Sequence, residues 1–571
     1  MREISTDILI LGSGGAGLFA ALHAHKADPS LSITIAVKGL LGKSGCTRMV
    51  QGGYNVALAK EDSIERHFMD TIEGGKWLPD QELAWKLVTL AVERIRELEN
   101  ELGCFFDRNP DGTVHQKAFA GQTFDRTVHK GDLTGIEIIN RLAEQVWARN
   151  IGRLEEHRAV ELIKSKSGDS IAGALFIDMR TGDYILVRAK AVLLATGGGP
   201  TMYKYHTPSG DKSCDGLAMA LRAGLPLRDM EMVQFHPTGL LAGTHTRMTG
   251  TVLEEGLRGA GGHLLNGARE RFMPRYDPKA ERATRDFVSR AMYTEMRLGN
   301  TSPNGGLFIS MKHLDRKMVE KQFRGMVERC ADCGFDLAGG LVEVVPTAHY
   351  MMGGVEFAAD CSTELKGLYV AGEDAGGVHG ANRLGGNGVA NSTVFGAVAG
   401  DVMADWARNQ KLEDPDRQAI DQAVRSCEPK ITRNHGSLEL LREQLYETMW
   451  QKVGIIRGEG GLRAALLELD SLEQELDRAG IADANRAFNL TWHDWLNLKN
   501  LVTTSRVIAQ AALARGDSRG AHYREDFPHA GPLEASAFTS LKIENSKLKM
   551  NLKPVSFTRV KPGATLLVGD L

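Results

Sequence analysis

The sequence contains few cysteines for its length. Seven stand in 571 residues, at positions 46, 104, 214, 330, 333, 361 and 427. An odd and scattered set of this kind argues against a disulfide framework and favours a reducing cytoplasm. Cys330 and Cys333 form a C-x-x-C without a second pair or a nearby histidine, so we expect no metal site there.

Long apolar runs and an excess of one charge are also missing. No apolar segment approaches the roughly 20 residues that cross a bilayer, so we expect no transmembrane segment. The chain enters an apolar strand near Ile4 without a basic, apolar leader, which predicts no secretory signal. Lys and Arg number 69 against 72 Asp and Glu, a net charge of −3. This balance gives no reason to expect a nucleic acid or an anionic membrane as partner.

Aromatic residues are scarce at 6%, whereas glycine is abundant. The 64 glycines in 571 residues are about 11%, against a usual value of about 7%. A hydrophobic content of 42% excludes disorder, and at about 150 residues per domain the length corresponds to three or four domain-sized units. This composition favours an α/β enzyme with tight turns around a phosphate-bearing cofactor.

The first forty residues have the pattern of a dinucleotide-binding unit. The apolar run Ile8–Leu11 predicts a strand, Leu18–His25 a helix and Ile33–Val37 a second strand. Between the first strand and the helix stands G-x-G-x-x-G, formed by Gly12, Gly14 and Gly17. These glycines permit a tight turn, close approach of a pyrophosphate and close helix–strand packing.

Two features distinguish this unit from the common NAD pattern. Lys38 stands at the end of the second strand, where an acidic residue usually binds the ribose. A second glycine-rich cluster follows the predicted strand 191–195, at Ala195, Thr196 and Gly197. Together with Gly372-Glu373-Asp374 it indicates a flavoprotein in which a late strand returns a carboxylate to the cofactor.

The composition and the hydrophobic periodicity change along the rest of the chain. Helical periodicity covers 81–102 and 133–149, and a hairpin-like stretch covers about 158–190. A region of mixed charge from about 237 to 345 separates the first part from a glycine-rich stretch at 366–400. After Asp401 helical segments dominate, for example at 439–453 and 462–479, and the pattern becomes strand-like past Leu533. We therefore predict a cofactor domain interrupted by an insertion and followed by a helical domain.

Several ordered motifs resemble the flavoprotein subunit of the fumarate reductase/succinate dehydrogenase family, which also includes L-aspartate oxidase. They extend from residue 4 to about 530, which leaves the C-terminal tail outside the resemblance. The segments that carry it are Gln51–Gly53, Asp215–Gly216, Gln234–Gly239, Glu255–Gly259, Thr284–Asp286, His349–Gly354, His379–Asn387 and Ser518–His522.

The resemblance implies an α/β fold in which a Rossmann-like FAD-binding domain carries an inserted α+β capping domain. The expected ranges are 1–236 and 346–402 for the two parts of the FAD-binding domain and 237–345 for the cap. A helical C-terminal domain at 403–533 and a tail at 534–571 complete the chain. The active site is then expected at the flavin, under the cap.

The resemblance also implies the chemistry: an FAD-dependent oxidoreductase acting on CH–CH groups, which transfers hydride between flavin N5 and a C=C/C–C bond beside a carboxylate in a small organic acid. His236, His349 and Arg383 match the positions that bind the substrate carboxylates, and we place Phe119 and Glu254 beside them. Arg285 matches the catalytic proton donor, and Glu255 with Arg258 the relay that reprotonates it. The alternative is a buried Arg–Glu–Arg network that holds the cap closed.

We expect FAD to be held by residues from all the glycine-rich segments and from the strands between them. They are Gly12, Gly14, Gly15, Ala16, Gly17, Lys38, Ser44, Thr47, Gln51, Gly52, Gly53, Ala159, Ala195, Thr196, Gly197, Asp215, Glu373, Arg383, Asn387 and Val389.

Three departures from the family pattern qualify these expectations. Cys46 stands where respiratory members carry the histidine that binds FAD covalently, so we expect noncovalent FAD, with a cysteinyl linkage as the alternative. Glu254 stands where the family has a threonine that donates a hydrogen bond to the substrate carboxylate. An ionised Glu254 only accepts hydrogen bonds and repels a carboxylate. It therefore favours a substrate with an amine, amide, hydroxyl or bulkier group at that end. The alternative is that Glu254 turns away or is protonated. Gly388 replaces a serine, which indicates a separate subfamily.

The electron partner and the overall reaction stay open at this point. The C-terminal tail is basic, and it is either a docking surface for an iron–sulfur or ferredoxin-like partner or an ordinary solvated edge. Its basic residues are Lys542, Lys547, Lys549, Lys553, Arg559 and Lys561. Such a partner could hold the chain peripherally at a membrane. Two rival functions are amine oxidation like that of L-aspartate oxidase, with Glu254 or Glu255 receiving the ammonium, and flavin electron transfer by a subunit that is active only with an iron–sulfur partner.

Overall fold

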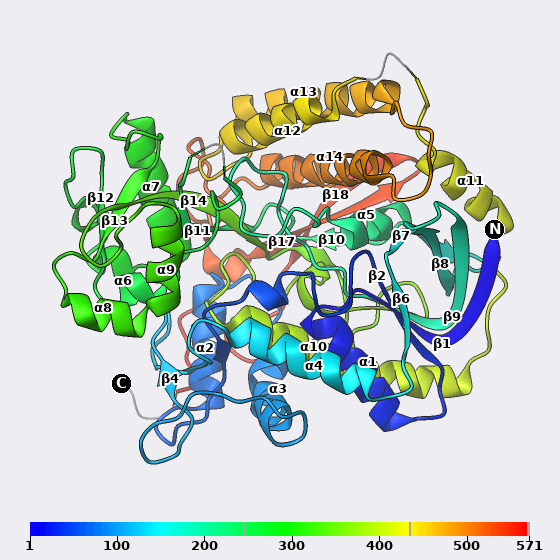
Figure 1. Cartoon of the computed structure of the whole chain (residues 1–571), viewed down its shortest axis with the longest axis horizontal. Coiled ribbons are helices and arrows are strands. Elements are labelled where there is room, and N and C mark those ends of the chain that lie inside the picture. The colour runs from blue at the N-terminus through cyan, green and yellow to red at the C-terminus, as the bar shows by residue number, and fades with distance from the viewer. Residues whose placement is uncertain (244–245, 433–435, 568–571) are drawn as a thin grey trace.

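The computed structural model describes residues 1–243, 246–432 and 436–567. Its central layer is a seven-stranded sheet in the order β6-β2-β1-β9-β8-β7, with β16 also paired to β9 (Figure 1). The parallel strands are β1 (Arg2–Leu11), β2 (Ile33–Val37), β6 (Gly152–Glu155), β9 (Tyr184–Leu194) and β16 (Leu368–Val370). The antiparallel strands β7 (His157–Lys164) and β8 (Ile171–Asp178) form the predicted hairpin-like stretch with the start of β9.

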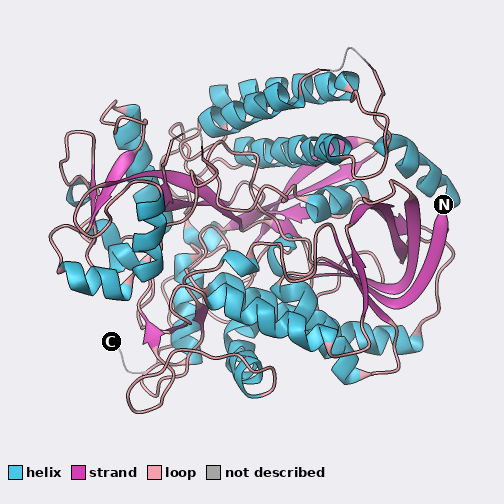
Figure 2. Ribbon diagram, viewed as in Figure 1, coloured by secondary structure: helices cyan, strands magenta, loops and turns pink. Residues whose placement is uncertain are grey.

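Helices cover both sides of this sheet (Figure 2). Helix α1 (Gly15–Ala27) packs against α10 (Asn387–Asn409) at very short range, because a Cβ on Gly396 would lie 2.6 Å from the carbonyl oxygen of Ala16. The helices beside them are α2 (Ile64–Gly74), α3 (Gln81–Asn100) and α4 (Thr134–Trp147). The predicted helices 81–102 and 133–149 are thus α3 and α4. Helix α3 begins after Asp80, whose carboxylate accepts from the first backbone N–H groups.

A second unit is inserted between β9 and β16 and lies at the left of Figure 1. Its four-stranded sheet has the order β11-β14-β13-β12. The strands are β11 (Val233–Leu240), β12 (His263–Leu265), β13 (Leu307–Ser310) and β14 (Val342–Met351), and the helices are α6 (Gly256–Gly259), α7 (Arg285–Arg297), α8 (Arg316–Gln322) and α9 (Arg324–Asp332). This unit has its own apolar core, formed by side chains such as Leu253, Val288 and Met326. The predicted insertion, 237–345, begins within β11 and ends within β14.

The C-terminal part is helical, as expected after Asp401. Its helices are α11 (Arg417–Cys427), α12 (Leu438–Lys452), α13 (Glu459–Ala479) and α14 (Leu490–Ala514). The tail then forms a hairpin of β17 (Ala537–Glu544) and β18 (Lys547–Pro554), and β17 pairs with β10 (Leu227–Arg228), which also pairs with β15 (Gly354–Val355). The tail is therefore built into the fold.

Short elements complete the frame of the site. A small sheet joins β3 (Tyr54–Asn55), β5 (Thr127–Val128) and β4 (Gln116–Lys117), and α5 (Asp215–Arg222) packs beside β7. Single turns of 3-10 helix lie at Thr47–Met49, Met273–Arg275, Ala280–Arg282, Gly372–Asp374 and Leu533–Ala535. Among the described residues, no helix combines the length and the apolar character that a membrane crossing requires.

Candidate active site

One cavity brings together segments that are far apart in the sequence. Its walls come from the β1–α1 turn, the segment 44–53, the end of β9, the inserted unit and the start of α10. Nearly all of the predicted site residues line it. Gly17, Arg258 and Asn387 do not: they lie next to lining residues, and Asn387 accepts from the side chains of Asn55 and His67.

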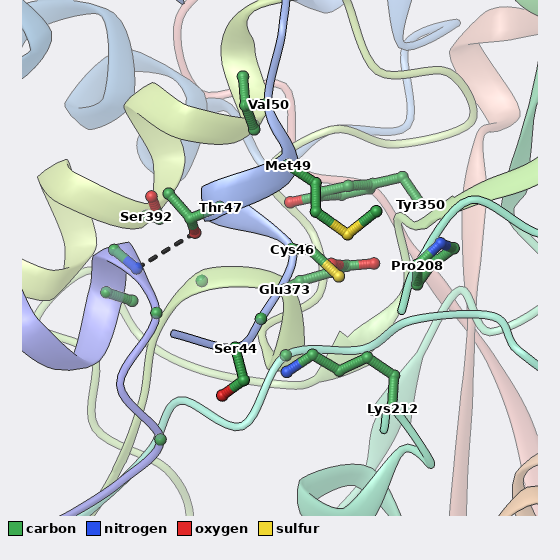
Figure 3. Close-up of a pocket in the computed structure, with 18 of the residues that line it drawn as sticks. Ser44, Cys46, Thr47, Met49, Val50, Pro208, Lys212, Tyr350, Glu373 and Ser392 are labelled. Atoms are coloured by element: carbon green, nitrogen blue, oxygen red, sulfur yellow. Dashed lines mark hydrogen bonds between the residues drawn. The ribbon is translucent and has the colours of Figure 1, made fainter. Parts of the chain in front are cut away.

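One end of the cavity is a cradle for a pyrophosphate. Gly12 has φ +115°, and a Cβ there would lie 2.1 Å from the carbonyl oxygen of Ala195; a Cβ on Gly17 would lie 2.1 Å from the carbonyl oxygen of Gly12. Gly14 precedes α1 and supplies no side-chain cap, so the first N–H groups of α1 face the cavity, except that Gly15 N donates to Thr47 Oγ1 at 3.1 Å (Figure 3). Such a helix start favours an anion. The cradle therefore fits a dinucleotide such as FAD.

Beside the cradle, Lys38 and Asp215 form a partly buried charged pair. Lys38 Nζ lies 2.9 Å from Asp215 Oδ2, and Arg158 Nη2 lies 2.8 Å from Asp215 Oδ1. Burial opposes ionisation of Asp215, but Arg158 and Lys38 outweigh it and hold its pKa below the usual range. The structure thus places two of the predicted cofactor residues in contact, with the Arg158 guanidinium as a third member of the cluster.

Cys46 faces the middle of the cavity, where Figure 3 shows it near Glu373 and Lys212. Burial and the Glu373 carboxylate raise the pKa of the Cys46 thiol to about 12. Because the thiolate is the nucleophile, this environment makes Cys46 unreactive at neutral pH. Glu373 Oε1 instead accepts from the backbone of Gly199 at 3.2 Å and of Met351 at 2.9 Å.

At the other end of the cavity, two histidines from adjacent strands lie close together. The rings of His236 on β11 and His349 on β14 are 5.4 Å apart. His236 Nδ1 accepts from Thr238 N at 3.3 Å, which assigns the ring proton to Nε2. Burial and the nearby Arg285 hold the pKa of both histidines well below 6.5. Both rings are therefore neutral hydrogen-bonding groups rather than cations.

Next to the histidines lies a buried chain of alternating charges. Arg285 donates from Nε to Glu255 Oε2 at 2.9 Å, and Arg258 Nη2 donates to Glu255 Oε1 at 3.1 Å. Burial opposes ionisation of Glu255, but Arg285 and Arg258 lower its pKa; burial lowers the pKa of Arg258. Arg285 and Glu255 line the cavity, whereas Arg258 lies behind Glu255 and donates to the carbonyl oxygen of Glu281 at 2.7 Å.

Arg383 is held by groups that the sequence analysis did not select. Gln234 Oε1 accepts from Arg383 Nη2 at 3.1 Å, and the Arg383 guanidinium lies 4.4 Å from the centre of the Tyr350 ring. Burial and Arg285 lower the pKa of Arg383 to about 10. Gln234 stands two residues before His236 in the same motif, which is the signal that could have identified it.

Glu254 lines the cavity, and its carboxylate is paired. Lys117 Nζ, from the end of β4, donates to Glu254 Oε1. Burial raises the pKa of Glu254, and Lys117 opposes that rise. Phe119, two residues after Lys117, packs so closely on Gly52 that a Cβ there would lie 2.5 Å from the ring. Lys117 belongs to none of the motifs and was not predicted as a site residue.

The described residues hold no group of three or more His, Cys, Asp or Glu side chains that could bind a metal ion. The remaining predicted contacts also line the cavity; they are Ser44, Gln51, Gly53, Ala159 and Val389. The site thus joins a nucleotide cradle to a pocket with cationic and neutral donors.

Comparison with known proteins agrees with this geometry. Residues 7–389 match the family model described as FAD binding domain, and residues 442–566 match the model described as fumarate reductase flavoprotein C-term. The chain belongs to the fumarate reductase/succinate dehydrogenase flavoprotein family. The second match reaches residue 566, so the expectation that the tail lies outside the family was wrong; β17 and β18 belong to it.

Relatives resemble the chain along almost its whole length. One of the subunits of the fumarate reductase (CoM/CoB) of Methanothermobacter marburgensis is 40% identical over 537 residues, covering 92% of this chain and 95% of that protein. The fumarate reductase flavoprotein subunit of Escherichia coli is 33% identical over 550 residues, covering 92% and 89%. A solved E. coli quinol fumarate reductase FrdA superposes with a TM-score of 0.91 at 31% identity, covering 99% of both chains.

These findings confirm the predicted family, the α/β fold class and the cofactor. The protein is an FAD-dependent oxidoreductase of the fumarate reductase/succinate dehydrogenase type.

Proposed function

We propose that this flavoenzyme reduces the C=C bond of a small unsaturated dicarboxylate such as fumarate. The observation that carries the proposal is that His236, His349 and Arg383 converge with the Arg285–Glu255 pair at one end of the cavity, while the nucleotide cradle forms the other end. That arrangement brings carboxylate-binding groups and a proton source to the place where the reactive part of FAD fits.

The carboxylates of the substrate are held by three groups of different character. Arg383 offers a planar guanidinium that binds a carboxylate through two N–H groups. His236 and His349 are neutral, so they donate hydrogen bonds without adding charge. FAD, when bound, supplies a hydride at N5. As negative charge develops on the substrate, the donors of this pocket stabilise it.

The proton comes from Arg285 in this proposal. Arg285 transfers an N–H proton to the carbon beside the one that receives the hydride, so that one hydride and one proton together saturate the C=C bond. Glu255 is a carboxylate in the resting state, so it first accepts a proton from Arg258 and then passes it to the deprotonated Arg285, along the hydrogen bonds already described. Solvent water returns a proton to Arg258 and closes the cycle. Burial of Arg258 favours its release of a proton, because it disfavours the charged form.

We propose further that FAD is bound noncovalently and that electrons arrive from an iron–sulfur protein. The high pKa of Cys46 supports the first point, because a thiol in that state does not attack the flavin. Relatives named as subunits support the second. The basic tail is a weak docking candidate, because Lys553 pairs with Glu356 and both Lys542 and Lys549 pair with Glu544. We propose the cytoplasm as location.

Amine oxidation is less well supported. An ammonium substrate would need a carboxylate without a cationic partner. Glu254 pairs with Lys117, and Glu255 pairs with both Arg285 and Arg258. Either carboxylate would have to leave its partner to receive the ammonium.

The deciding experiment follows flavin absorbance in the anaerobically photoreduced holoprotein when fumarate is added. We expect rapid reoxidation with formation of succinate, reduced at least about 100-fold in Arg285→Ala, as for loss of a general acid. A normal flavin spectrum without reoxidation by fumarate would overturn the proposal. Peroxide formation from aspartate in air would establish amine oxidation. Reoxidation of the already photoreduced flavin by fumarate that appears only when an iron–sulfur protein is added would establish the electron-transfer hypothesis.

A further inference from the structure

The pair formed by Lys117 and Glu254 joins two parts of the fold at the substrate end of the cavity. Lys117 ends β4, next to the FAD-binding fold, and Glu254 belongs to the inserted unit just before Glu255. The Glu254 side chain is 5% exposed and lines the cavity, whereas the Lys117 side chain is 20% exposed and lies outside the lining. Lys117 therefore contacts Glu254 without lining the cavity itself.

Other charged groups near Glu254 act against its ionisation. Asp132, just before α4, and Glu255, in the same segment, are both acidic and raise its pKa together with burial. Arg329 of α9 is directed elsewhere: it donates from Nη1 to the carbonyl oxygen of Val252 at 3.3 Å. Lys117 is thus the cation that balances the Glu254 carboxylate.

A dicarboxylate brings two negative charges to this end of the cavity. An ionised and unpaired Glu254 would repel it at short range, more strongly than in water because the site is buried. The Lys117 ammonium removes most of that repulsion while it stays outside the reacting space. A chain with glutamate at this position can then bind the same class of substrate as one with a neutral residue.

We propose that Lys117 determines the substrate specificity of the cavity by neutralising Glu254, so that the site accepts a dicarboxylate. Lys117 is a positioning residue in this sense, since it acts on the substrate only through Glu254. The inference rests on the proposed function, because it assumes that a dicarboxylate binds at the substrate end.

The test measures binding rather than turnover, so that it does not depend on the proton transfer or on an electron donor. Malonate, a dicarboxylate without a reducible bond, is titrated into the oxidised holoprotein, and its Kd is taken from the change in flavin absorbance. The variants are Lys117→Gln, Lys117→Arg and the double variant Lys117→Gln with Glu254→Gln. Lys130→Gln is the matched control, because Lys130 is a nearby lysine whose Nζ lies 3.4 Å from Asp107 instead.

We expect Lys117→Gln to weaken malonate binding at least about tenfold at alkaline pH. The loss should shrink as the pH falls, because Glu254 has a raised pKa and becomes neutral when it is protonated. Lys117→Arg should bind nearly as tightly as the wild type, and the double variant should recover most of the loss at every pH. Lys130→Gln should leave the Kd unchanged.

Two results would overturn this inference alone: equal malonate affinity in Lys117→Gln and the wild type at every pH, or a pH-independent loss that Glu254→Gln does not rescue. The second result would mean that Lys117 only supports the local structure. If the wild type, with a normal flavin spectrum, binds neither malonate nor fumarate, the proposed function itself fails, and the inference falls with it.

Discussion

Arg285 and Arg383 share one acceptor, the Oε1 atom of Gln234, at 3.2 and 3.1 Å. Two guanidinium groups this close repel each other, and the amide oxygen between them offsets part of that repulsion. The amide itself is fixed, because Gln234 Nε2 donates to Asn382 Oδ1 at 3.0 Å and to the carbonyl oxygen of Arg383 at 2.7 Å. Gln234 therefore sets the distance between the proposed proton donor and the proposed carboxylate-binding arginine.

Replacing Gln234 tests this arrangement. Gln234→Leu keeps a similar volume but removes the shared acceptor, so each arginine loses one of the contacts that orient it. We expect kcat for fumarate reduction to fall at least about tenfold and KM to rise, since a small misplacement of reacting groups is costly. Steady-state kinetics of the holoprotein measures both. Gln410→Leu, at an exposed position after α10, is the control. Unchanged kcat and KM in Gln234→Leu would show that the arginines hold their positions without it.

The nucleotide cradle gives a prediction that separates folding from cofactor binding. In Gly12→Ala the new methyl group meets the Ala195 carbonyl and the residue is forced to keep φ +115°, so we expect a loss of at least about 2 kcal/mol of unfolding free energy. In Gly14→Ala the nearest atom is Thr47 Oγ1 at 3.6 Å and φ is −75°, so the fold should keep its stability.

The two variants should therefore differ in the stability of their apoproteins and agree in their low FAD content. FAD content after purification is expected to be low in both, because Gly12 and Gly14 line the cavity at the start of α1, where the pyrophosphate is expected to bind. Thermal unfolding of the apoproteins distinguishes them, with a lowered Tm in Gly12→Ala only. Full FAD occupancy in Gly14→Ala would place the pyrophosphate elsewhere in the cavity.

Local patterns in the sequence predict the helices and strands, but not which side chains or strands from distant segments contact one another. Helices such as α3 and the strand at Ile33–Val37 follow from periodicity, and the glycines before α1 follow from the turn that they form. The pairing of Lys117 with Glu254 joins residues 137 positions apart, and nothing local in either segment encodes it. The same holds for β17, whose basic pattern predicts a strand but not its partner β10.

The expected effect of Glu254 shows the consequence of that limit. Taken alone, a glutamate in place of a threonine argues against a dicarboxylate substrate. With Lys117 in contact, the same glutamate belongs to a pair without net charge. The sequence shows that a glutamate stands at this position, whereas the electrostatic effect of Glu254 on a substrate depends on its contact with Lys117 from a distant segment.

The neutral state of the two histidines gives a prediction about pH. Burial and Arg285 hold the pKa of His236 and of His349 well below 6.5, so both rings are already deprotonated at neutral pH and lose no proton as the pH rises through 6.5. We therefore expect KM for fumarate to stay level between about pH 6 and 8. Steady-state kinetics with a dye as electron donor measures it. His349→Gln, which keeps a neutral donor, should retain this flat profile at a higher KM. A KM that rises about tenfold per pH unit above 6.5 in the wild type, and no longer does so in His349→Gln, would mean that a histidine binds the carboxylate as a cation.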